Sequence, residues 1–152
     1  MGIEVSVEVV KPRKLAAVRR QVPVGGVASA WRPALDQVWA FLRSHPGIRT
    51  DGHNIFLYHH ASPGNPMNVD FGVEVARSFS PSGEVYETTT PAGEAAIAVH
   101  RGGYDQLHVA HDAVHQWTKS HGRTFAGHSW EIYGDPCDDP RETETTVVYL
   151  LA

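Results

Sequence analysis

Residues 41–45 (FLRSH) recur in altered form as residues 117–121 (WTKSH), 76 positions further along the chain. Other pairs of segments keep the same order at nearly the same offset. They are 12–18 (PRKLAAV) with 91–97 (PAGEAAI), and 69–76 (VDFGVEVA) with 145–152 (TTVVYLLA). Self-similarity at one offset is the mark of a repeated structural unit. The sequence therefore predicts two copies, roughly residues 1–78 and 79–152, within a single domain spanning residues 1–152.

Each copy has the pattern strand, strand, helix, strand, strand. Polar and apolar residues alternate where we expect half-buried strands, and apolar residues recur every three or four positions where we expect a helix. The expected strands are 3–10, 15–22, 54–60, 67–75, 84–90, 95–101, 129–134 and 144–151, and the expected helices are 27–45 and 104–121. These elements predict an α+β fold, in which a curved, eight-stranded antiparallel sheet carries both helices on one face.

Alternation along residues 54–58 and 129–133 divides their side chains between the two faces of the sheet. We expect four apolar residues to pack beneath the helices: Ile55, Leu57, Trp130 and Ile132. The opposite face then presents Glu131 among three aromatic rings: Phe56, Tyr58 and Tyr133. Aromatic walls bury flat ligand surface, and a carboxylate neutralises a cation, so this set favours a small-molecule site. The alternative is that Glu131 is a solvated strand residue and the tyrosines are ordinary sheet residues.

Several motifs resemble those of the GyrI-like (gyrase-inhibitor-like) family, to which bacterial effector-binding domains belong. They are residues 58–60 (YHH), 69–75 (VDFGVEV), 100–104 (HRGGY), 129–136 (SWEIYGDP) and 142–151 (ETETTVVYLL). The resemblance implies two related halves with a central ligand groove. It also implies that Glu131 is a buried acid contacting the ligand, with Tyr133 and Tyr58 as wall residues and Tyr149 and Tyr104 at further motif positions. Gly134 departs from the pattern, because a larger residue is common there.

The resemblance leaves several functions open. The first is a stand-alone domain that holds an apolar or aromatic organic molecule, cationic or electrophilic, as a multidrug-type effector or toxin. The second is hydrolysis, because some stand-alone members of the family are hydrolases of strained cyclopropane-bearing toxins. For this chain the resemblance then implies that Glu131 activates water without a cofactor. Burial raises the pKa of a carboxyl group and so makes it a better base near neutral pH. The third alternative is a protein-interaction domain of the gyrase-inhibitor type.

Composition and charge disfavour other partners. Thirteen basic residues against 17 acidic ones, a formal net charge of -4, provide no basic face for nucleic acid. Apolar runs are too short to cross a membrane. No secretory signal is apparent, and the single cysteine, Cys137, suits the cytoplasm. His108, His111 and His115 are interpreted as an exposed helix face, because the glutamate of the helical zinc motif is absent. No metal and no cofactor are therefore expected.

Overall fold

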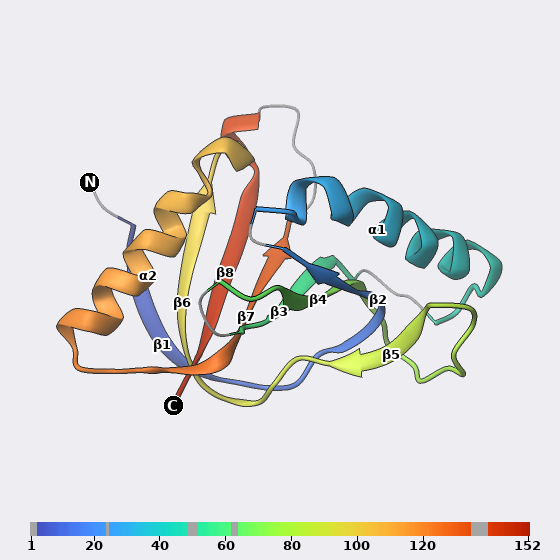
Figure 1. The fold of residues 1–152 in the computed structure, drawn as a ribbon, viewed down its shortest axis with the longest axis horizontal. Coiled ribbons are helices and arrows are strands. Elements are labelled where there is room, and N and C mark those ends of the chain that lie inside the picture. The colour runs from blue at the N-terminus through green and yellow to red at the C-terminus, as the bar shows by residue number, and fades with distance from the viewer. Residues whose placement is uncertain (1–2, 24, 49–51, 62–63, 135–139) are drawn as a thin grey trace.

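The computed structural model describes residues 3–23, 25–48, 52–61, 64–134 and 140–152. They form one antiparallel sheet and two α-helices (Figure 1). The elements are β1 (Val5–Val10), β2 (Lys14–Val22), α1 (Val27–Ser44), β3 (Asn54–His59), β4 (Met67–Glu74), β5 (Tyr86–Thr89), β6 (Gly93–Arg101), η1 (Tyr104–Gln106), α2 (His108–Ser120), β7 (Phe125–Tyr133), η2 (Pro140–Glu142) and β8 (Glu144–Leu151). Cys137 and the Asp135–Pro136 part of the quoted motif lie outside the described residues.

The predicted α+β class, with eight antiparallel strands, is confirmed by the strand order β1-β6-β8-β7-β3-β4-β2-β5. The first strand of each half pairs with the other half, β1 with β6 and β5 with β2. Each strand of the first half has a counterpart in the second: β1 and β5, β2 and β6, β3 and β7, β4 and β8. When every strand is exchanged for its counterpart, the same strand order is obtained, read in reverse. Two copies of one unit that meet at β3 and β7 would produce this order.

The predicted and observed elements differ most at α2 and β7. The helix α2 begins at His108 and not at Tyr104, because residues Tyr104–Gln106 form the separate 3-10 turn η1. The strand β7 begins at Phe125 and not at Ser129. A register shift against β8 separates Phe125 from Ser129, and Gly127 has a φ of 90° within that interval. Such a positive φ is costly for residues with a side chain and natural for glycine. The bulge interrupts the alternation of side chains, and for this reason the sequence pattern revealed only the second half of the strand.

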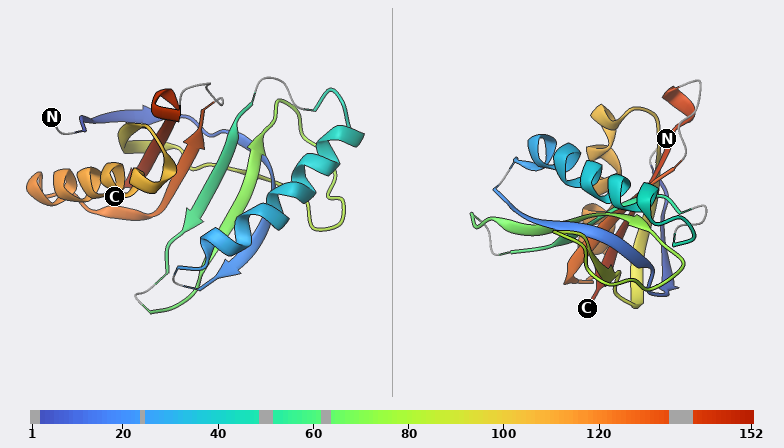
Figure 2. Two further views of the ribbon diagram at one scale, coloured as in Figure 1. Left: turned by 90° about the horizontal axis from the view of Figure 1, so that it is seen from above. Right: turned by 90° about the vertical axis from the view of Figure 1, so that its right-hand side faces the viewer.

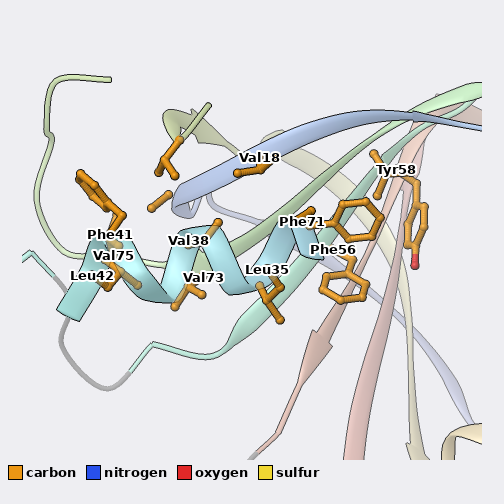
Figure 3. Packing of buried hydrophobic residues seen from close by; sticks show 14 of the residues in the cluster. Val18, Leu35, Val38, Phe41, Leu42, Phe56, Tyr58, Phe71, Val73 and Val75 are labelled. Atoms are coloured by element: carbon orange, nitrogen blue, oxygen red, sulfur yellow. The ribbon is translucent and has the colours of Figure 1, made fainter. Parts of the chain in front are cut away.

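Both helices lie on the same side of the sheet, as the right-hand view of Figure 2 shows. Beneath α1, a core cluster contains Val38 and Phe71, and Figure 3 shows the side chains around it. A matching cluster beneath α2 contains Val114 and Val147. A third cluster, on the helix-free face, contains Trp130. The sheet therefore has apolar side chains on both faces.

The prediction of which residues face the helices is wrong. Ile55, Leu57 and Trp130 are buried in the cluster on the helix-free face, with Ile132 packed against them. Phe56, Tyr58 and Tyr133 belong to the α1 cluster, and Glu131 lies opposite Phe56 in the β3–β7 pair. Alternation separates the two sets but does not say which one the helices cover. The carboxylate and its aromatic neighbours thus lie between the two helices.

Candidate functional site

A cavity of about 320 Å³ lies over the β3–β7 pair, between the first turns of the two helices. Three groups of residues line it: Val27, Trp31 and Leu35 from α1; Asn54, Phe56 and Tyr133 from the sheet, with Gly134 directly after β7; and Tyr104 from η1 with Leu107, which precedes α2. Its volume is at the lower end of the range for small-molecule pockets, about 300–1,000 Å³. We call it the groove.

Four aromatic rings follow one another along the groove. The ring centroids are 6.2 Å apart for Trp31 and Phe56, 4.8 Å for Phe56 and Tyr133, and 5.7 Å for Tyr133 and Tyr104. Tyr104 stands at the rim with 59% of its surface exposed. These rings provide an apolar surface with an electron-rich face, which attracts flat apolar groups and cations.

Glu131 lies behind Tyr133 and is 5% exposed. Its Oε1 accepts hydrogen bonds from the hydroxyls of Tyr58 and Tyr133, both at 2.5 Å. Its Oε2 lies 2.7 Å from Nε2 of His111. Burial by itself would raise the pKa of Glu131, but the hydrogen bonds from His111, Tyr133 and Tyr58 outweigh it and lower that pKa. The carboxylate is therefore ionised at neutral pH, and the expectation of a raised pKa is wrong.

Both tyrosines that bind Glu131 remain protonated. Burial and the charge of Glu131 raise the pKa of Tyr58, and burial with the neighbouring Tyr58 and Glu131 raises the pKa of Tyr133. A phenol that stays protonated is a permanent hydrogen-bond donor. The two hydroxyls therefore hold Glu131 in its ionised form on the floor of the site.

His111 connects Glu131 to a third tyrosine hydroxyl, that of Tyr149. Its Nδ1 lies 2.6 Å from Oη of Tyr149, and His115 Nε2 lies 3.3 Å from the same oxygen. An ionised carboxylate only accepts hydrogen bonds, so Nε2 of His111 carries the hydrogen that it donates to Glu131. In neutral His111, Nδ1 can then accept the hydrogen of Tyr149. The result is a continuous chain of polar contacts from Tyr133 in the groove to α2.

The interpretation of His111 as part of an exposed helix face is wrong, since it packs against β7 and β8. One signal could have found it: His111 lies four residues after Leu107 and three before Val114 and thus on the apolar stripe of its helix. Trp31 and Leu35 lie on the apolar stripe of α1 and pack in the core cluster beneath that helix, and both also line the groove.

The six predicted site residues fall into three groups according to their place relative to the groove. Phe56, Tyr133 and Tyr104 line the groove. Glu131 and Tyr58 lie behind the lining and contact it through Tyr133. Tyr149 lies further away and reaches Glu131 through His111.

Gly134 lines the groove where the family pattern has a larger residue. A Cβ at this position would lie 2.8 Å from the carbonyl oxygen of Glu144, closer than real Cβ contacts come. The glycine therefore permits the close approach of the two chain segments at this edge of the groove.

A second buried carboxylate, Asp70, belongs to the helix-free face. Arg19 binds it through two nitrogens, both at 3.0 Å, and His59 and Tyr86 contact it at 2.6 and 2.5 Å. Burial by itself would raise the pKa of Asp70, but these partners lower it to about 2. Because its charge is already paired with Arg19, we assign Asp70 to structure.

The helix-free face also has a hollow of about 520 Å³ next to the β1–β2 connection. Trp130 forms part of its lining but is only 2% exposed, and Lys11, Arg13 and Glu8 bring both signs of charge to it. The groove, which combines exposed aromatic surface with one ionised carboxylate behind it, is the stronger candidate site.

Comparison with known proteins gives one family and a consistent fold. Residues 3–151 match the family described as "GyrI-like small molecule binding domain". Comparison with curated protein sequences gave no match. Within the described residues, neither helix is both long and apolar enough to span a membrane.

Solved structures with a similar fold include the C-terminal domain of EcmrR (22% identity, TM-score 0.81, covering 100% of this chain and 99% of that one). SAV2435 bound to tetraphenylphosphonium is 12% identical, with TM-score 0.76 and coverage of 98% and 94%. A hydrolase from Listeria innocua is 12% identical, with TM-score 0.65 and coverage of 98% and 92%. At these identities the similarity shows the fold alone.

Proposed function

Because the chain belongs to the GyrI-like family of small-molecule-binding domains, we propose that its groove holds an organic molecule with aromatic surface and a positive charge. One observation carries this proposal: an ionised, buried carboxylate, Glu131, lies directly behind the aromatic lining of a cavity of about 320 Å³.

The two halves of the chain contribute different chemistry to the groove. The first half supplies the apolar wall of Val27, Trp31, Leu35 and Phe56. The second half supplies Tyr104, Tyr133 and the carboxylate behind them. An amphipathic ligand would therefore place its apolar body against α1 and its charge toward β7.

The attraction for a cation has two sources. A cation over an aromatic ring gains about 0.5–2 kcal/mol, depending on how far it is desolvated. The charge of Glu131 adds to this across Tyr133, because little water screens it inside the protein. Glu131 does not itself line the groove, so the cation either acts through the Tyr133 ring or displaces that ring to reach the carboxylate.

Tetraphenylphosphonium is a suitable probe, since it is permanently cationic and one structural neighbour is described with it bound. Isothermal titration calorimetry should give saturable binding to the wild-type chain. Glu131→Gln should weaken that binding at least about tenfold, equivalent to about 1.4 kcal/mol. The glutamine keeps the shape of Glu131 and an oxygen that accepts from both tyrosines, so the fold should persist.

Glu84→Gln is the matched control, because Glu84 is exposed and pairs with Arg20 away from the groove. It should bind the probe like the wild type. If the wild type fails to bind tetraphenylphosphonium, the proposal of a cationic ligand is wrong. Equal affinities for Glu131→Gln and wild type would show that the carboxylate is not the anchor.

Hydrolysis by Glu131 fits this geometry less well than binding does. A general base needs a free lone pair beside the attacking water and a pKa near the working pH. Glu131 already accepts three hydrogen bonds, and they lower its pKa. We therefore favour binding without turnover.

A further inference from the structure

The charge behind the groove depends on a single histidine. Among the described residues, His111 is the one side chain able to carry positive charge that forms an ion pair with Glu131. Both side chains are largely buried, at 23% and 7% exposure. The corresponding residue of the first half, 76 positions earlier, is Leu35, which lines the groove. The histidine is thus found in the second half of the chain only, where it lies behind the groove lining and contacts Glu131.

Several titratable groups surround His111: Glu131 on β7, Tyr149 on β8, His60 after β3, and Asp112 and His115 on α2. Burial and then the charge of Glu131 raise the pKa of Tyr149, which stays neutral. Burial and neighbouring histidines lower the pKa values of His60 and His115. Glu131 stays ionised, and Asp112 is exposed to solvent.

Histidine is the side chain whose charge ordinarily changes between pH 5 and 8. With His111 protonated, its positive charge cancels that of Glu131 and also repels a ligand cation. With His111 neutral, Nε2 still donates to Glu131, and the site keeps a net negative charge. The hydrogen bond therefore survives both states, while the charge presented to the groove does not.

On the basis of the proposed function, we propose that His111 determines ligand charge preference, so that a cationic ligand binds with release of the His111 proton. The proton passes to solvent from the partly exposed imidazole, and no other bond is made or broken. Proton and cation then compete, and each lowers the apparent affinity of the other by the same factor. An uncharged ligand of the same shape is indifferent to this proton.

The test compares tetraphenylphosphonium with uncharged triphenylphosphine oxide by calorimetry between pH 5.5 and 8. For wild type, the affinity for the cation should rise with pH, by up to about tenfold per pH unit in the acidic part of the range. The affinity for the neutral probe should stay level. In buffers of different ionisation enthalpy, the observed binding enthalpy of the cation should vary with the buffer, which reports proton release. The binding enthalpy of the neutral probe should not vary.

His111→Gln should abolish both the pH dependence and the proton release, because its amide donates to Glu131 but does not titrate. His108→Gln, which removes an exposed histidine from the same helix, should behave like wild type. If thermal melting shows that the glutamine variant is unfolded, His111→Leu is used in its place. Leucine is the residue at the corresponding position of the first half, Leu35.

A wild-type affinity for the cation that is independent of pH would overturn the proposal, as would the same pH dependence in His111→Gln. Binding of the cation in either case would leave the proposed function intact. If neither probe binds at any pH, the proposed function fails, and the role of His111 fails with it.

Discussion

Replacing Asp70 with asparagine tests whether the two buried carboxylates have the different roles that the structure assigns to them. Asp70 is fully buried on the helix-free face and is held by Arg19, His59 and Tyr86. Asp70→Asn keeps the size of the side chain but removes the charge that pairs with Arg19. We expect loss of stability without loss of affinity for tetraphenylphosphonium, because the groove lies on the other face.

The magnitude follows from the pKa of Asp70, which falls from the ordinary 3.8 to about 2 in the folded chain. Each unit of difference between the folded and unfolded pKa values is worth about 1.4 kcal/mol. The ionised carboxylate therefore contributes about 2.5 kcal/mol at neutral pH. Since the folded pKa is the lower one, this contribution is complete above about pH 4 and disappears as the pH falls toward 2.

Thermal and urea denaturation of both proteins between pH 2 and pH 7 would measure this contribution. At pH 7 the variant should melt about 5–10 °C below the wild type, given the size of the chain. The two curves should converge near pH 2. Glu84→Gln, which removes an exposed carboxylate, should follow the wild type throughout.

Equal stability of Asp70→Asn and wild type at pH 7 would refute the idea that this network stabilises the fold. A difference that persists at pH 2 would show that the asparagine amide, and not the lost charge, causes the effect. Weaker ligand binding in a fully folded variant would contradict the assignment of Asp70 to structure.

Further measurements address the groove and the core. Trp31→Ala should weaken binding of tetraphenylphosphonium at least severalfold in calorimetry, because it removes one ring of the aromatic wall. Trp130→Ala should instead lower the free energy of unfolding by about 3–5 kcal/mol, as expected for a buried aromatic ring; urea titration distinguishes the two. Thr145→Val should leave stability unchanged or raise it by up to about 1 kcal/mol, because no hydrogen-bond partner for the buried Thr145 hydroxyl is found among the described residues. A strained cyclopropane-bearing electrophile, followed by chromatography, should disappear no faster with wild type than with Glu131→Gln; faster loss with wild type would favour hydrolysis.

Local patterns in the sequence were sufficient to predict the helices and strands of the fold. Alternation and helical spacing placed the strands and helices to within about two residues, except that α2 and β7 each begin four residues from the predicted position. The same alternation correctly grouped Glu131 with Tyr133, and Phe56 with Tyr58, on common faces. These properties depend on neighbours two to four residues apart, so they can be read without knowing how the chain packs.

Which face the helices cover was decided by tertiary structure. Both faces of the sheet have large apolar side chains, Trp130 on one and Phe56 on the other, so hydrophobicity does not distinguish them. The contact of His111 with Glu131 depends likewise on how α2 is rotated over β6 and β8, and 20 residues separate the two in sequence. Periodicity specifies which residues share a face, but long-range packing determines what that face meets.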